Sequence, residues 1–212
     1  MPDGKIPFHR RSGEMPPPRA FSTVLRELAS QATHDVSIET VQKALADRSF
    51  AALIMFFSAI NLLPLPIGSS VILGLPLIII SAQMVIGYTA PWLPRLIASR
   101  SISAATFRKM ETRLTPRVEK LEKYIRPRRW PFDVRTGEFV VGAVCLFLAI
   151  LLVIPLPLGN WPPAFALFFY GVALSERDGI ILAVATAIGI GASVLFFGVL
   201  LSATVLAHAI AG

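Results

Sequence analysis

Residues 61–70, with the sequence NLLPLPIGSS, interrupt a long apolar stretch of the chain. Residues 155–160, PLPLGN, interrupt a second apolar stretch in the same way. Two prolines placed two residues apart and followed by glycine cannot continue a helix, because each proline removes a hydrogen-bond donor and clashes with the preceding turn. Each stretch is therefore expected to form two helical arms joined by a break.

The composition predicts an integral membrane protein. Of the 212 residues, 54% are hydrophobic and 16% are charged, whereas soluble domains have about 45–50% and about 25%. These values exclude a disordered chain, a collagen and a nucleic-acid-binding globule. The single cysteine, Cys145, excludes a disulfide scaffold and is expected to be a small buried hydrophobe.

The positive charge lies in two blocks that flank the apolar stretches. Of the 20 Lys and Arg residues, seven lie in residues 1–48, twelve in residues 88–138 and one, Arg177, beyond them. Positive flanks remain on the cytoplasmic side of a membrane. The pattern predicts a multi-pass protein of the bacterial inner membrane, with the lipid bilayer and not nucleic acid as its partner, and with its N-terminus and both blocks in the cytoplasm.

Amphipathic patterns precede each apolar stretch. Residues 21–46 are expected to form two short helices, with Ser37 or Asp35 as a cap of the second. Residues 103–125 show a second amphipathic pattern that Pro116 is expected to kink or divide. Beside a membrane, such helices either lie on the interface or pack against the membrane bundle.

Further local expectations concern charge pairs and the last apolar run. Glu119 and Lys123 have the spacing of a helical ion pair. Residues 176–178 are predicted to form a solvated loop. The run 180–210 has 31 residues, about 46 Å as one helix, which is too long for a simple span. Gly189 and Gly191 offer a place to bend or divide it, so the run forms either one helix or two.

The two apolar stretches match each other. The pattern Pro-Leu-Pro-aliphatic-Gly at Pro64 recurs at Pro155, 91 positions later, and Asp47 corresponds to Glu138 at the same offset. A chance match in an apolar protein is one explanation, and duplication of a broken-helix unit is the other. We interpret the match as duplication, because the order of the preceding segments also agrees.

The breaks have two alternative interpretations. Each is a re-entrant helix break at membrane depth, whose free backbone groups form a site, or it is a hairpin turn outside the membrane. Under the first interpretation, the two breaks meet near the centre of the protein, and Asp47 and Glu138 gate the site. Alternatively, Asp47 and Arg48 form a structural pair at the membrane interface. The predicted substrate or ion pathway consists of Asp47, Arg48, Asn61, Pro64, Pro66, Gly68, Ser69, Ser70, Glu138, Pro155, Pro157, Gly159 and Asn160.

Six stretches together are similar to one known family: DRSF at 47–50, the segment 61–70, GLP at 74–76, PWLP at 91–94, PLPLGN at 155–160 and ERDG at 176–179. The sequence resembles the exopolysaccharide synthesis ExoD family of bacterial membrane proteins over roughly residues 21–205. This resemblance implies an inner-membrane protein linked to exopolysaccharide production and implies no established catalytic mechanism.

Signatures of enzymatic chemistry are not apparent in the sequence. His9, His34 and His208 are scattered and lack the spacing of metal ligands. The chain contains no Gly-rich phosphate loop and no nucleophile elbow. We therefore expect no enzyme activity, no cofactor and no metal.

The predicted fold is an all-α membrane protein with four to six membrane helices. It comprises two pseudo-symmetric units of broken, re-entrant helices and amphipathic interfacial helices. The expected segments are a disordered Pro-rich tail (1–20), the first unit with its amphipathic helices (21–87), a basic cytoplasmic segment (88–138) and the second unit with one or more C-terminal membrane helices (139–212).

Two functional hypotheses remain. The first is a small transporter or ion- or proton-coupled permease with its site at the paired breaks. The alternative is a non-transporting scaffold or regulator that binds exopolysaccharide assembly proteins through its basic cytoplasmic face. Small residues at Ala187, Gly191 and Gly198 share one helical face, which predicts close approach of another helix and a homodimer.

Overall fold

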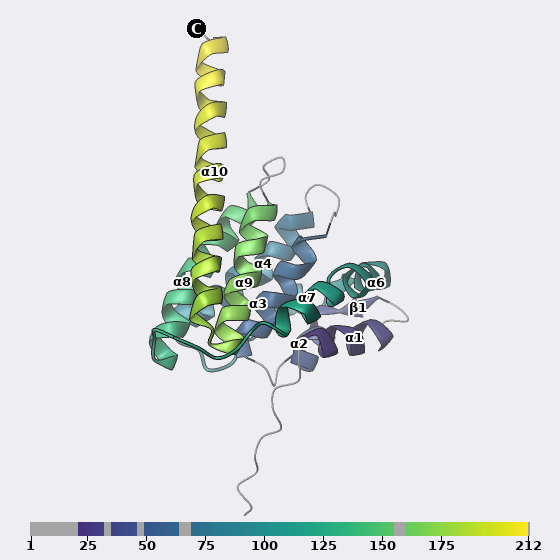
Figure 1. Cartoon of the computed structure of the whole chain (residues 1–212). Coiled ribbons are helices and arrows are strands. Elements are labelled where there is room, and N and C mark those ends of the chain that lie inside the picture. Colours follow the sequence, from purple (N-terminus) through teal and green to yellow (C-terminus); the bar gives the residue numbers. More distant parts are fainter. Residues whose placement is uncertain (1–20, 32–34, 46–48, 64–68, 155–159, 212) are drawn as a thin grey trace, which may run out of the picture.

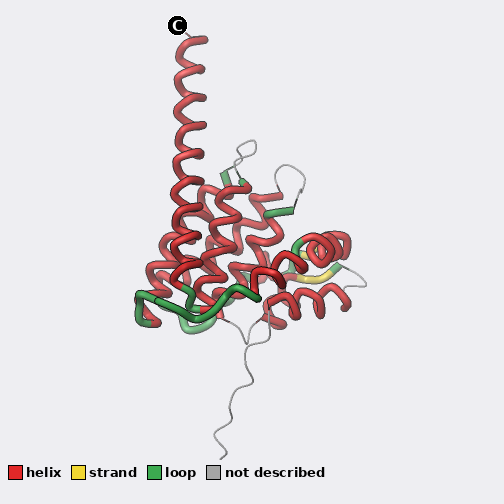
Figure 2. Tube along the Cα trace, viewed as in Figure 1, coloured by secondary structure: helices red, strands yellow, loops and turns green. Residues whose placement is uncertain are grey.

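The computed structural model describes residues 21–31, 35–45, 49–63, 69–154 and 160–211. Within these residues the protein is mostly helical, and a short two-stranded sheet is present (Figures 1 and 2). The fold class predicted from the sequence is confirmed at this level. Its finer features, pseudo-symmetry and re-entrant units, stay predictions, since both breaks lie outside the described residues.

Four apolar helices form the main bundle: α3 (Ser49–Asn61), α4 (Ser69–Ile86), α8 (Val134–Val153) and α9 (Trp161–Glu176). Helix α3 packs against α4 and α9, and α8 packs against the same two helices, so the four helices close into a ring (Figure 1). A fifth helix, α10 (Gly179–Ala211), packs mainly against α9. Helices α8 and α10 are long and apolar enough to cross a membrane.

Helix α3 is the core of the protein. Every residue from Phe50 to Asn61 is buried. Its 13 residues would extend only about 20 Å, less than the roughly 30 Å hydrocarbon core of a bilayer. Because protein surrounds α3, it does not need lipid around it, and its short length is accommodated.

An amphipathic layer covers the remaining side of α3. It contains α1 (Phe21–Gln31), α2 (Ile38–Leu45), α5 (Arg95–Ala98), α6 (Ala104–Arg113) and α7 (Thr115–Glu122). The strands β1 (Val36–Ser37) and β2 (Ser101–Ile102) pair antiparallel within this layer.

The apolar side of this layer is directed at the bundle. The Phe107 ring of α6 lies 6.0 Å from the Phe56 ring of α3, centroid to centroid. Of the two alternatives left open by the sequence, the structure therefore shows helices packed against the bundle.

The helices expected for this layer are confirmed. The chain from residue 21 contains the two expected short helices, and the Thr40 backbone N–H donates to the Ser37 Oγ at 3.2 Å as a helix cap. The second amphipathic pattern divides into α6 and α7, with Pro116 in the first turn of α7. Proline is accepted there because the first backbone N–H groups of a helix have no helical partner.

Helix α10 decides between the two alternatives left open for the last apolar run. It is one continuous helix of 33 residues, about 50 Å long. Gly189 lies in ordinary contact with the Leu148, Tyr170 and Ala166 side chains, and Gly191 has open space around it. A single glycine costs a helix only about 1 kcal/mol relative to alanine, so it does not by itself break one.

Close packing of α8 on α4 depends on Gly142. A Cβ added at this position would lie 2.7 Å from the Met84 Cβ and 3.3 Å from the Val85 backbone N. We expect Gly142→Ala to separate the two helices and to destabilise the protein by about 1–3 kcal/mol. The measurement is thermal unfolding of the purified protein in mild detergent.

Gly189→Ala is the matched control, because it makes the same change in another apolar helix where an added Cβ meets atoms only at 3.5 Å or more. Its unfolding temperature should stay the same or rise, since alanine favours a helix over glycine. Equal effects of the two variants would contradict the assigned α4–α8 contact.

Candidate functional site

The structure tests only part of the pathway predicted from the sequence. Asp47, Arg48 and the break residues Pro64, Pro66, Gly68, Pro155, Pro157 and Gly159 lie outside the described residues. Ser69 and Ser70 form the first turn of α4. The meeting of the two breaks therefore stays a prediction.

Two predicted site residues lie at helix ends that flank the breaks. Asn61 is the last residue of α3, is buried, and its Nδ2 donates to the Phe57 carbonyl oxygen at 2.8 Å. Its Oδ1 has no hydrogen-bond partner among the described residues. Asn160 precedes α9 and accepts from the Ala164 backbone N–H at 3.2 Å through its carbonyl oxygen. Asn61 thus offers a buried acceptor directly before the first break.

Glu138 lies away from the breaks. It is half-buried near the start of α8, whereas the second break follows the end of that helix at Val153. The intervening length of α8 is about 22 Å. The structure therefore does not bring Glu138 to the end of α8 where the break begins.

The turn between α9 and α10, residues 177–178, holds the most buried charge in the described structure. Asp178 is 0% exposed, so the expectation of a solvated loop is wrong for this residue, although Glu176 and Arg177 are exposed. The Arg128 Nε–H donates to both Asp178 carboxylate oxygens, at 3.3 Å and 3.1 Å. The carboxylate also accepts from the backbone N–H groups of Ile180 and Arg126, at 2.9 Å and 3.3 Å.

Asp178 therefore has two structural tasks. It caps α10, whose first backbone N–H groups have no helical partner and carry the positive end of the helix dipole. It also holds the connector between α7 and α8, residues 123–133, against the α9–α10 turn. An aspartate directly before a long apolar run is a helix-start signal, which sequence reasoning could have used here.

The backbone strengthens this attachment. The Gly179 N–H donates to the Arg128 carbonyl oxygen at 2.8 Å, and the Arg128 N–H donates to the Arg177 carbonyl oxygen at 3.3 Å. A side chain at Gly179 would overlap with the Arg129 carbonyl group. Arg177 ends α9 in the left-handed conformation, with φ of 50°, which allows the chain to reverse within a short turn.

The pKa of Asp178 results from two opposing effects. Burial would raise it, but the hydrogen bonds from Arg128 and from the backbone of Ile180, Arg126 and Ile181 favour the ionised form and hold the pKa below its usual value. The carboxylate is therefore charged at neutral pH.

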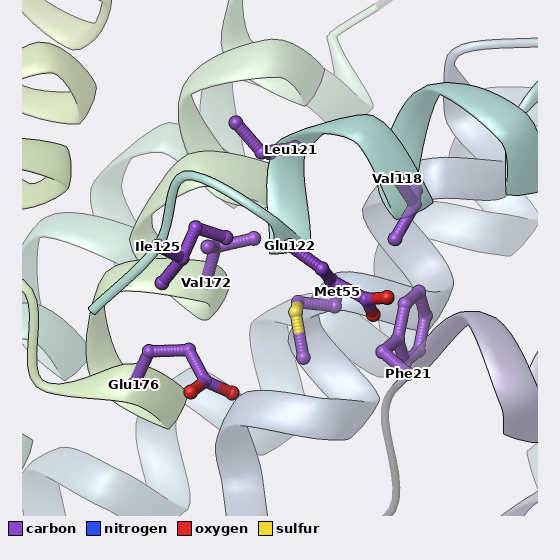
Figure 3. A pocket seen from close by; sticks show the side chains of 8 residues that line it. All are labelled: Phe21, Met55, Val118, Leu121, Glu122, Ile125, Val172 and Glu176. Carbon is purple, nitrogen blue, oxygen red and sulfur yellow. The ribbon is translucent and has the colours of Figure 1, made fainter. Parts of the chain in front are cut away.

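A pocket of about 200 Å³ lies between the amphipathic layer and the bundle (Figure 3). The Glu122 carboxylate accepts from the Ser22 backbone N–H at 3.0 Å and from the Ser22 Oγ–H at 2.6 Å, so it caps α1 from α7. The second carboxylate that lines the pocket is that of Glu176. The pocket is lined by Phe21, Met55, Val118, Leu121, Glu122, Ile125, Val172 and Glu176.

One neighbouring ion pair differs from the sequence expectation. Glu119 pairs with Arg26 of α1 rather than with Lys123 of its own chain segment. Ion pairs between segments depend on tertiary packing, which helical spacing does not report. The Arg26 pair and the Glu122 cap together attach α1 to α7.

The described residues contain no group of three or more His, Cys, Asp or Glu side chains that could hold a metal ion. Among the described carboxylates, Glu122 and Asp178 cap helices and Glu119 forms an ion pair.

Comparison with known sequences identifies the family. Residues 21–198 match the family described as "Exopolysaccharide synthesis, ExoD". The chain belongs to the ExoD family. This match covers the bundle, the amphipathic layer and the part of α10 that packs against the bundle, and it confirms the resemblance seen in the sequence.

Two relatives of this ExoD-family chain have curated sequences. It is 25% identical over 166 residues to Protein ExoD of Rhizobium meliloti, covering 76% of this chain and 69% of the relative. It is 28% identical over 149 residues to the uncharacterized protein slr1875 of Synechocystis, covering 69% and 70% of the two chains. No solved structure matches this chain.

In this ExoD-family protein, we expect Asp178→Asn to destabilise the fold by about 1–2 kcal/mol at neutral pH, because the charge-assisted hydrogen bonds are weakened. The folded-state pKa of Asp178 is lowered and an unfolded aspartate has a pKa of about 3.9. The stabilisation is therefore complete well above pH 4 and is lost as the pH falls through the folded-state pKa. Thermal unfolding of both proteins between pH 7 and pH 3 measures this.

Glu176→Gln serves as the control for this experiment, since it neutralises an exposed carboxylate two positions away. It should change the unfolding temperature little at any pH. A constant difference between the wild type and Asp178→Asn down to pH 3 would show that the Asp178 charge does not stabilise the fold.

Proposed function

We propose that this protein is a multi-pass inner-membrane scaffold of exopolysaccharide synthesis. Its bundle lies in the bilayer, and its amphipathic layer holds a basic surface toward cytoplasmic assembly proteins. The proposal starts from the family, whose description is exopolysaccharide synthesis, and adds a mode of action that follows from the geometry of α6 and α7.

The outer faces of the bundle support the membrane placement. Large apolar side chains are exposed on α4, α8 and α9, among them Ile72, Phe147 and Phe165, and lipid is the environment that favours such a surface. Exposed tryptophans lie at helix ends of the bundle: Trp161 at the start of α9, and Trp92 after the end of α4. Tryptophan is enriched where a membrane protein crosses the bilayer interface.

The basic surface comprises the exposed side chains Arg108, Lys109, Arg113, Arg117 and Lys120. The opposite side of the same two helices, with Phe107, Met110, Leu114 and Val118, is buried in the protein. This is the observation that carries the proposal. Because the apolar side already packs against the protein, the helices do not insert into lipid by that side, and the cationic side is held outward for an acidic partner.

Reversal of this charge should reduce exopolysaccharide production. We expect Arg113→Glu, Arg117→Glu and Lys120→Glu, combined in one variant, to lower exopolysaccharide output several-fold while the protein remains folded in the membrane. Repulsion of an acidic partner gives the physical reason. Secreted exopolysaccharide per cell and the amount of the protein in the membrane fraction are the two measurements, made in a strain whose own copy is deleted.

The matched control combines Arg95→Glu, Arg100→Glu and Arg135→Glu, which change the net charge equally at other exposed positions. It should keep the output near that of the wild type. Equal loss in both variants would indicate a general charge effect and contradict the scaffold surface.

A permease is the second candidate function, and one observation favours it. The buried Asn61 Oδ1 has no hydrogen-bond partner among the described residues and lies at the end of α3, where the chain enters the first break.

Flux into proteoliposomes distinguishes the two candidates. A permease predicts solute- or proton-dependent flux that Asn61→Leu reduces at least ten-fold, because the polar acceptor is removed. Ser81→Ala is the control, since it removes a buried hydroxyl from the interior of α4. If the wild-type protein gives the same flux as empty liposomes, the permease is excluded and the scaffold remains.

A further inference from the structure

The turn between α9 and α10 brings together arginines that are far apart in the sequence. Arg177 lies about 50 residues beyond the connector that contains Arg126, Arg128 and Arg129, yet the two segments are in contact. The Arg128 backbone N–H donates to the Arg177 carbonyl oxygen, and the Arg126 backbone N–H donates to the Asp178 carboxylate, both at 3.3 Å. Figure 1 shows the connector crossing from α7 to the start of α8 past this turn. Four arginines therefore lie in one small region of the protein.

One of these four arginines is committed to the fold. Arg128 pairs with the buried carboxylate of Asp178. The other three, Arg126, Arg129 and Arg177, are exposed, and no hydrogen bond or ion pair joins their guanidinium groups to another described residue. We call these three residues the arginine cluster. Their guanidinium groups are available for a ligand.

The carboxylates near the arginine cluster leave it positive. Asp178 is compensated by Arg128, and Asp133 caps α8. Glu176, which precedes Arg177, is exposed. The three cationic side chains therefore outnumber the one carboxylate that remains beside them, and such a surface favours an anionic ligand.

Two of the three arginines occupy positions where the backbone favours glycine. Arg129 and Arg177 both have φ of 50°, and within the described part of the chain they are the residues other than glycine with positive φ. Glycine adopts this left-handed conformation readily, whereas a residue with a Cβ is disfavoured in it. The local structure therefore does not explain arginine at either position. Disfavoured backbone conformations gather at functional sites, and here the side chains that the fold does not use are cationic.

The arginine cluster adjoins the starts of both candidate membrane spans. The apolar span of α8 begins at Arg135, six residues after Arg129, and the apolar span of α10 begins at Gly179, two residues after Arg177. Trp130, an aromatic residue of the kind enriched at the bilayer interface, lies between the first pair. With α8 and α10 in the bilayer, the cluster lies at the level of the lipid headgroups.

We propose that the arginine cluster binds the headgroup phosphate of an anionic phospholipid in the cytoplasmic leaflet. Guanidinium groups match phosphate oxygens with paired hydrogen bonds, and the cytoplasmic leaflet carries anionic lipids. Arg126 and Arg129 belong to the connector and Arg177 to the α9–α10 turn, so one headgroup reinforces the attachment of the amphipathic layer to the bundle. The inference rests on the proposed membrane placement and does not require a protein partner for the basic surface of α6 and α7.

Native mass spectrometry of the full-length protein tests the proposal. The protein, purified in mild detergent, is mixed with equal amounts of phosphatidylglycerol and of phosphatidylcholine, whose phosphate charge is balanced by choline. The wild type should retain phosphatidylglycerol several-fold more than phosphatidylcholine. The double variant Arg129→Gly, Arg177→Gly should retain both lipids equally, because two of the three guanidinium groups are removed.

The choice of glycine separates lost binding from lost folding. Since glycine suits the left-handed backbone at both positions, the unfolding temperature of the double variant without added lipid should equal or exceed that of the wild type. A variant that loses stability together with the lipid would indicate a structural role for the two arginines and overturn the proposal.

A second double variant, Arg113→Gln with Arg117→Gln, removes the same charge from the basic surface of α6 and α7 and is the matched control. It should keep the preference for phosphatidylglycerol. Equal retention of the two lipids by the wild type, or the same loss in the control, would contradict a lipid site at the cluster. Millimolar inorganic phosphate should leave the lipid bound, and its displacement would assign the cluster to a soluble anion instead.

Carbonate extraction of cell membranes tests the membrane placement on its own. The wild type and the glycine variant should both remain in the membrane pellet. Release of the wild type would refute the membrane placement. Retention in the pellet combined with equal binding of the two lipids would refute only the lipid site.

Discussion

The Asp178 carboxylate joins three parts of the chain that are far apart in sequence. It accepts hydrogen bonds from the start of α10, from the Arg126 backbone and from the Arg128 side chain. These bonds hold the connector between α7 and α8 against the α9–α10 turn. Because the connector continues from α7, they also help to hold the amphipathic layer beside α3. The start of α10 and the connector that follows α7 are therefore both held by this one buried charge.

The burial of α3 gives the protein its layered design. A helix of 13 residues is too short to span a bilayer alone, but here α4 and α9 cover it on one side and the amphipathic layer on the other. The apolar side of the layer packs against α3. Its cationic side is consequently free of any packing role, which is why a binding function for it is physically reasonable.

Much of the local structure could be predicted from the sequence. Apolar periodicity placed the short helices from residue 21, and Pro116 marked the division between α6 and α7. These features depend on neighbouring residues, whose spacing and backbone constraints are visible in one dimension. The partners of Glu119 and Asp178 could not be predicted, because Arg26 and Arg128 reach them only after helices distant in sequence have packed.

The sequence by itself determined the helical class, the family and the two interruptions of the apolar stretches, since composition and proline chemistry act locally. Tertiary structure decided which side chains share a site. It buried Asn61 at the end of α3 and turned Asp178, expected in a solvated loop, into a buried cap. The physical reason is that burial and pairing depend on distances across the bundle, which no local pattern contains.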